Sequence, residues 1–180
     1  MKTIGHILVC VVLVFSLFAC GKKVEKVSVD KEGNEYKVDD DVSFYYPKEF
    51  KLEMNTTNDE QDPSTLRFIH QEQVFYYTVE RSNYDNEPQD MKELYYGELE
   101  QMNASSIKVK QPVLDSGLSC YEFSGQFKDT GIKFTNLVYF ENQTTYIYGY
   151  QAKTDVYNKE IKKMLIFLES FYKSSGKLND

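Results

Sequence analysis

Short runs rich in aromatic and β-branched residues, bounded by polar turn residues, recur along most of the chain. This pattern predicts β-strands, for example at residues 132–141 and 144–152. The other predicted strands are residues 36–38, 42–46, 66–71, 74–81, 107–113 and 118–128, and residues 48–54 are expected to continue in extended form. Turn residues such as Asp115-Ser116-Gly117 and Asn142-Gln143 join neighbouring runs, so the strands after residue 106 are expected to form a meander.

Two segments carry apolar residues at helical spacing. The first starts at Pro88, whose missing N–H suits the first turn of a helix, and closes at residues 103–106. Its apolar arc is Met91, Leu94, Tyr95, Leu99 and Met102. The second starts at Thr154 or Asp155 and stops at residues 174–176. Its stripe is Tyr157, Ile161, Met164, Leu165, Leu168, Phe171 and Tyr172, of which Ile161, Leu165 and Leu168 are expected to be buried against the sheet.

Apolar residues occur on both faces of the predicted strands. In residues 132–141, Phe134 and Val138 lie on one face, and Leu137 and Tyr139 lie on the other. A sheet with one face in water would alternate more cleanly between apolar and polar residues. The expected fold class is therefore α+β, with an antiparallel sheet sandwiched between helices.

The N-terminal segment has a different pattern. Lys2 precedes a mainly apolar run whose dense part, residues 7–18, is too short to span a bilayer as a stable helix but has signal-peptide length. Leu17-Phe18-Ala19-Cys20 resembles the lipobox of bacterial lipoprotein signal peptides. The resemblance implies cleavage before Cys20 and acylation of its thiol, which would hold the protein on the extracytoplasmic face of a cell membrane. A plain secretory signal and an uncleaved anchor are the alternatives.

These patterns divide the chain into four parts. They are a signal peptide (1–19), the lipidated cysteine with a charged, flexible tether (20–34), a single domain (35–173) and a frayed tail (174–180). With 180 residues in the precursor, the mature chain is long enough for one core and too short for two typical domains.

Residues 42–50, Val-Ser-Phe-Tyr-Tyr-Pro-Lys-Glu-Phe, are similar to the opening of PsbP-like domains, where a strand ends in Tyr-Pro and an aromatic residue follows shortly. The order of elements is similar too, through to a last helix ending in Ser170-Phe171. The resemblance implies an α/β/α sandwich with an antiparallel sheet over nearly the whole domain. Several bacterial members of this family are lipoproteins, and its best-known members assist the oxygen-evolving complex of photosystem II. The resemblance carries over the fold and no functional residue.

Charge and residue types exclude some functions. The net charge is −7, and an acidic domain without a basic stripe is a poor binder of nucleic acid. His70 is the one histidine of the expected mature chain, and its alternation with Leu66 and Phe68 predicts a packed side chain rather than a base or ligand. Cys120, left without a disulfide partner once Cys10 is cleaved off and Cys20 is lipidated, is expected to be buried and slow to react. No cofactor and no metal site is expected, since the sequence has neither a glycine-rich phosphate loop nor a calcium-loop pattern.

Two features remain as candidate sites. Glu98 lies on the apolar arc of the first helix, where it either reaches the edge and pairs with a lysine or faces a pocket with a raised pKa. Tyr146, Tyr148 and Tyr150 share one face of the last long strand, with Tyr139 on its hairpin partner. These tyrosines are core if a helix covers them, and an aromatic platform for a sugar, peptide or protein if it does not.

The leading hypothesis for function is a non-catalytic binding or assembly module for an extracytoplasmic protein or an envelope component. The scarcity of catalytic groups favours it, because nucleophilic catalysis needs a nucleophile with a base in reach. A small carboxylate-dependent hydrolase is the second hypothesis. A solute-binding receptor of a transporter is the third, for which the chain is short.

Overall fold

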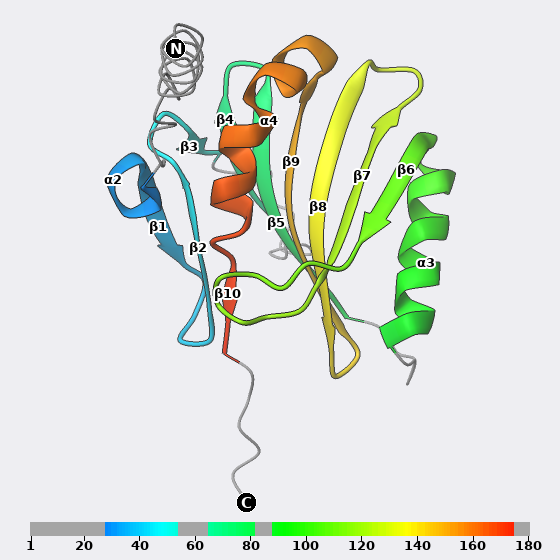
Figure 1. Cartoon of the computed structure of the whole chain (residues 1–180), viewed down its shortest axis with the longest axis horizontal. Helices are drawn as coiled ribbons and strands as arrows, with labels where there is room; N and C mark the ends of the chain where they lie inside the picture. The colour runs from blue at the N-terminus through cyan, green and yellow to red at the C-terminus, as the bar shows by residue number, and fades with distance from the viewer. Residues whose placement is uncertain (1–27, 54–64, 82–87, 175–180) are drawn as a thin grey trace, which may run out of the picture.

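A seven-stranded antiparallel sheet forms the centre of the computed structural model, which describes residues 28–53, 65–81 and 88–174 (Figure 1). The sheet has the strand order β3-β4-β5-β9-β8-β7-β6. Its strands are β3 (Lys51–Leu52), β4 (Thr65–His70), β5 (Gln73–Arg81), β6 (Ala104–Lys110), β7 (Tyr121–Phe127), β8 (Ile132–Glu141) and β9 (Thr144–Lys153). Strand β9 pairs with β5 on one side and β8 on the other, which joins the early hairpin to the predicted meander.

A second, three-stranded sheet lies over one face of the large sheet. Its order is β1-β2-β10, with β1 at Gly33–Lys37, β2 at Val42–Pro47 and β10 at Tyr172–Lys173. The Asp39 carboxylate accepts hydrogen bonds from the backbone N–H groups of Asp41 and Val42, both at 2.8 Å, and so holds the turn between β1 and β2. Because β10 pairs with β2, the two ends of the described chain are fastened together.

The two long helices cover opposite faces of the large sheet. Tyr157 of α4 (Thr154–Leu168) is hydrogen-bonded to Thr135, whereas Tyr95 of α3 (Pro88–Gln101) is hydrogen-bonded to the next residue of β8, Asn136. Successive residues of a strand point to opposite faces, so the two helices lie on different sides. The expected α+β fold with an antiparallel sheet between outer layers is confirmed, and one outer layer combines α4 with the small sheet (Figure 1).

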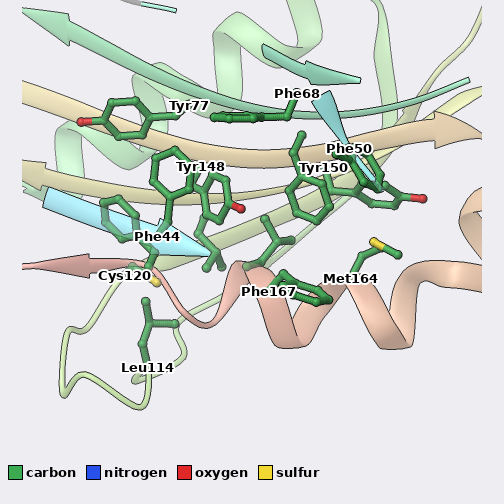
Figure 2. Close-up of a cluster of buried hydrophobic side chains, with 14 of the residues drawn as sticks. Phe44, Phe50, Phe68, Tyr77, Leu114, Cys120, Tyr148, Tyr150, Met164 and Phe167 are labelled. Atoms are coloured by element: carbon green, nitrogen blue, oxygen red, sulfur yellow. The ribbon is translucent and has the colours of Figure 1, made fainter. Parts of the chain in front are cut away.

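The larger hydrophobic core lies between the large sheet, α4 and the small sheet (Figure 2). The Phe44 ring stacks on Tyr148 with 4.4 Å between ring centroids and meets Phe68 edge-on at 5.8 Å. The largest fully buried side chains of this core include Phe44, Phe68, Phe75, Tyr148, Tyr150, Met164, Phe167 and Leu168. Aromatic rings bury more area than other side chains, so they supply most of the hydrophobic stabilisation here.

The ordered domain begins earlier than Glu35. Residues 29–32 form a short helix, α2 (Val29–Glu32), and Gly33 begins β1, so residues 28–34 do not belong to the expected tether. Gly33 is buried, and a Cβ there would lie 2.8 Å from the Val29 carbonyl oxygen and 2.9 Å from Cε1 of Phe167. This close packing needs a glycine and depends on α4, which is far away in sequence. The expected signal peptide (1–19), residues 20–27 and residues 175–180 lie outside the described residues.

The last helix ends earlier than predicted, and its most deeply buried residues differ in part from those expected. Helix α4 stops at Leu168, and Tyr172, expected within it, belongs to β10. The Ser170 hydroxyl donates to the Phe167 carbonyl at 2.5 Å and accepts from the Tyr45 N–H at 2.9 Å, which redirects the chain toward β2. The buried residues of α4 are Met164, Phe167 and Leu168. Of the three residues expected to be buried, Leu168 is, while Ile161 and Leu165 remain partly exposed.

Candidate functional site

The tyrosines of β9 proposed as a binding platform are mainly core residues. Tyr148 and Tyr150 are fully buried beneath β2 and α4 (Figure 2). The Tyr148 hydroxyl donates to the Tyr45 carbonyl at 2.7 Å, and the Tyr150 hydroxyl donates to Oε1 of Gln73 at 2.8 Å. Burial raises the pKa of both hydroxyls. The platform hypothesis is therefore wrong for Tyr148 and Tyr150, and the core alternative is the observed one.

Tyr139 and Tyr146, the other two candidates, are partly buried near the end of the β8–β9 hairpin. The Tyr139 hydroxyl donates to Oε1 of Glu141 at 3.1 Å, and Glu141 Oε2 lies 2.5 Å from Nζ of Lys173. Lys173 also lies over the Tyr146 ring, 5.2 Å from its centroid. Burial by itself would lower the pKa of Lys173, but the hydrogen bond and charge of Glu141 outweigh it and raise that pKa. These contacts fasten β10 to the large sheet, which is a structural role.

The opposite face of the sheet is less completely covered. Between α3 and strands β5, β8 and β9 lies a cavity of about 600 Å³, here called the α3 groove. Its lining residues are Tyr76, Thr78, Glu80, Tyr95, Glu98, Leu99, Gln101, Met102, Phe127, Asn136, Ile147 and Gln151. Glu98 is exposed and lies at this groove, which is the pocket-facing position that the sequence left open.

A directional chain of hydrogen bonds lies in the groove. The Tyr76 hydroxyl donates to Oδ1 of Asn136 at 2.5 Å, and Nδ2 of Asn136 donates to the Tyr95 hydroxyl oxygen at 2.8 Å. Gly149 makes room for this arrangement, since a Cβ there would lie 2.4 Å from Cζ of Tyr76 and 2.6 Å from Oδ1 of Asn136. Because the Tyr95 oxygen accepts, its own proton remains available for donation.

The groove has a negative electrostatic character. Burial raises the pKa of both Tyr76 and Tyr95, and the nearby charge of Glu80 raises it further in each case. The charge of Glu98 also raises the pKa of Tyr95, whereas the hydrogen bonds with Asn136 lower the pKa of both tyrosines. Both hydroxyls are therefore neutral at physiological pH, so they serve as hydrogen-bonding groups and not as bases.

The exposed side of α3 continues this surface. Tyr95 and Leu99 are its buried apolar residues, whereas Leu94 is 49% exposed and Met102, directly after the helix, is 54% exposed. Their spacing of four residues on either side of Glu98 places the three side chains in one row, here called the α3 row. The predicted apolar arc is thus wrong for Leu94 and Met102, because the helix buries a narrower face than its sequence allows.

The candidate nucleophile and base lie elsewhere. Cys120 is 3% exposed, and burial, with a smaller contribution from the charge of Glu122, raises the pKa of its thiol to about 12. The burial expected for this thiol is confirmed. The His70 ring is partly buried and packs 5.5 Å from the Phe50 ring, as expected for a packed histidine. In the described ranges, no group of three or more His, Cys, Asp or Glu residues could hold a metal ion.

Two residues in the sequence are signals for the groove that hydrophobic periodicity does not reveal. Asn136 is a polar residue in the middle of the apolar strand β8, and Gly149 interrupts the tyrosine-rich strand β9. A buried amide needs partners, and a glycine inside a strand marks a close approach of other atoms. Which partners these residues have depends on strand pairing and on α3.

No protein-family model matches the chain, and no curated protein matches it by sequence. Among the helices described here, none is long and apolar enough to cross a membrane. Solved structures do match it in fold. The solution structure of cyanobacterial PsbP (CyanoP) from Synechocystis covers 86% of this chain and 98% of its own, with 13% identity and a TM-score of 0.59.

The Ran-binding protein Mog1p of Saccharomyces cerevisiae is similar as well. The match covers 78% of this chain and 95% of that protein, with 6% identity and a TM-score of 0.52. At such low identity the similarity extends to the fold and not to particular residues. The chain has a PsbP-like fold, as the pattern at residues 42–50 implied.

Proposed function

We propose that this protein is a membrane-anchored extracytoplasmic lipoprotein that acts as a non-catalytic binding or assembly module for a protein partner. The observation that carries the binding function is the α3 groove, an open cavity beside the exposed apolar side chains of Leu94 and Met102. Exposed apolar residues around a cavity are typical of surfaces that a partner covers. Mog1p, a Ran-binding protein with the same fold, shows that this fold can serve in protein binding.

The placement of the candidate nucleophiles supports a non-catalytic role. A thiol with a pKa of about 12 is almost entirely protonated at neutral pH, so Cys120 is a poor nucleophile. The ring of His70 packs against Phe50, away from the residues that line the α3 groove. Recognition needs only the rigid sheet, the helix and the groove between them.

The position of the groove suits a lipid-anchored protein. Seven residues lie between Cys20 and Ser28, so even an extended chain of eight residue steps spans at most about 29 Å between them. Figure 1 shows α2, where the described chain begins, at one side of the domain and α3 at the other. An anchor at Cys20 would therefore hold the α2 side toward the membrane and leave the α3 groove accessible to another envelope protein.

Two measurements test this proposal. Mass spectrometry of the mature N-terminus is expected to find an acylated Cys20, and an intact Met1 would contradict the lipoprotein assignment.

The second measurement tests binding at the groove. A photo-crosslinking residue at position 102 is expected to capture one defined protein in the envelope. The matched control is the same residue at position 159, where Lys159 is largely exposed on α4. Equal capture from both positions would contradict binding at the groove.

Carboxylate-dependent hydrolysis is the second candidate, and one observation favours it. Two carboxylate side chains, Glu80 and Glu98, line the same groove. If the protein is a hydrolase, Glu98→Gln removes a turnover that the wild type shows on a panel of glycosides and esters. If it is a solute receptor, a small molecule raises the melting temperature, because a ligand of the native state stabilises it.

A further inference from the structure

The α3 groove combines apolar walls with a polar floor. Leu99, Met102, Phe127 and Ile147 supply apolar surface, and the Tyr76–Asn136–Tyr95 chain supplies hydroxyl groups. A ligand group that fills such a space has an apolar stem and a polar head. Lysine and arginine side chains have this form, since they bury their methylene groups while the charged end seeks polar partners.

The charge of the groove selects a cation over an anion. Among the described residues that line it there are two glutamates, Glu80 and Glu98, and neither a lysine nor an arginine. The carboxylate of Glu98 is close enough to the Tyr95 hydroxyl to raise the pKa of that hydroxyl. A positive group beside Glu98 would therefore gain Coulomb attraction.

The surroundings of Glu98 favour a macromolecule as the bearer of that cation. Leu94 and Met102 are both about half exposed, one on each side of Glu98 in the α3 row. A small cation would neutralise Glu98 but leave both apolar side chains in water. A protein surface with a basic side chain inside an apolar patch would cover Leu94, Glu98 and Met102 together. Protein interfaces commonly place such a basic residue among apolar contacts.

We infer that the α3 groove docks a protein partner by receiving one lysine or arginine side chain, with the cation at Glu98 and apolar partner residues on Leu94 and Met102. This inference rests on the proposed binding function and specifies the chemistry of the partner. The Tyr95 hydroxyl, which has a proton to donate, is placed to bond a carbonyl of the incoming segment.

Selection from a displayed library of random short peptides tests the inference on the full chain in detergent micelles. Enriched peptides are expected to contain a lysine or arginine next to apolar residues. An enriched peptide is then remade with norleucine in place of its basic residue, and its affinity is expected to fall about tenfold or more through loss of the charge. Peptides without a basic residue, or no enrichment at all, would overturn the inference.

Variants of α3 supply the controls. Glu98→Gln is expected to weaken the basic peptide about five- to tenfold and leave the norleucine peptide unchanged. Glu100→Gln removes the same charge from an exposed position of the same helix that does not line the groove, and affinity is expected to stay within twofold. If both variants lower the affinity for the basic peptide equally, the peptide is attracted by the overall charge of α3 and does not dock at Glu98, which would overturn the inference.

Free arginine amide and spermidine separate a protein partner from a small solute. Either compound is expected to compete with the peptide only at concentrations at least a hundredfold above the peptide's Kd. Competition at equal concentrations would make the groove a cation-solute site and overturn the inference.

The peptide results do not depend on the lipid anchor. A missing lipid on Cys20 would contradict the lipoprotein assignment and would not affect the peptide selection. If the peptide selection fails, crosslinking from position 102 can still show that a partner binds the groove through other chemistry.

Discussion

The two faces of the large sheet carry similar aromatic and apolar residues but are covered to different extents. One face is closed by α4 and by the small sheet, and its tyrosines are buried core residues (Figure 2). The other is covered by α3 over β7, β8 and β9, where a smaller cluster around Tyr95, Leu99 and Phe123 forms beside the groove. Tyrosine is therefore neither a core nor a surface residue by itself, because the covering layer decides which role it takes.

The contrast also separates stability from binding. On the closed face nearly every large side chain is buried, so a change there alters packing. On the α3 face, exposed residues adjoin a cavity, so a change there can alter recognition while the fold persists. The predictions below test this separation, from the largest expected effect to the smallest.

Phe167→Ala should have the largest effect on stability. The Phe167 side chain is fully buried in the closed core, so its removal leaves a large cavity. We expect a loss of about 3–5 kcal/mol in the free energy of unfolding, measured by denaturant titration. Leu165→Ala, on the partly exposed side of α4, is expected to cost less than half as much. Equal losses would mean that Leu165 is buried as deeply as Phe167.

Gly149→Ala should destabilise the face of the sheet that α3 covers. Its Cβ would lie 2.4 Å from Cζ of Tyr76, so the ring and the hydrogen bond to Asn136 would have to shift. We expect a loss of about 1–3 kcal/mol in the free energy of unfolding.

Gly97→Ala is the matched control for this change. Gly97 lies in α3, and apart from its chain neighbours and the nearby backbone of its own helix no atom lies within 4 Å of an added Cβ. Alanine is the better helix former, so this variant is expected to gain about 0.5–1 kcal/mol. A gain at both positions would contradict the described packing of Tyr76 on β9.

Tyr148→Phe should cost about 1 kcal/mol, because it removes the donor to the buried Tyr45 carbonyl. Tyr146→Phe, at the partly exposed end of the same face, is expected to stay within about 0.5 kcal/mol of the wild type. Thermal unfolding of the two variants side by side provides the measurement. A larger effect of Tyr146→Phe would show that the hairpin end, and not the core, depends on its hydroxyl.

Cys120 should react with thiol reagents only when the closed face opens. At neutral pH we expect labelling of the native protein to be slower than that of the urea-unfolded chain by at least about a hundredfold, since opening must precede reaction. Its thiol pKa is about 12 in the folded state against 9.0 ordinarily. The unfolded state therefore loses this proton first, and stability should fall as pH rises from 9.0 to about 12. Labelling at the unfolded rate would contradict the burial of Cys120.

Glu98→Gln should have the smallest effect on stability. The side chain is exposed at the groove, so the free energy of unfolding is expected to change by less than about 0.5 kcal/mol. The same variant is expected to weaken the basic peptide, as argued above. A change in stability as large as that of Tyr148→Phe would place Glu98 in the structural core of α3 and not in a binding surface.

The sequence predicted the secondary-structure elements that depend on neighbouring residues. Aromatic and β-branched runs with polar turns predicted the meander, and Pro88 marked the start of α3. The aromatic pattern at residues 42–50 pointed to the PsbP-like fold. The aromatic-rich run around Cys120 predicted a buried thiol, and Cys120, directly before β7, is buried.

Tertiary structure alone decided the rest. An apolar stripe shows which residues can be buried, but the surface packed against it determines how deeply each one is buried. Phe167 is therefore fully buried and Leu165 only partly, while Leu94 and Met102 stay exposed. The short helix at residues 29–32 and the start of β1 at Gly33, which the sequence did not predict, depend on packing against Phe167 of α4, far along the chain. The groove requires Tyr76, Tyr95 and Asn136 to meet from three elements, and such long-range contacts leave no periodic signal in a single sequence.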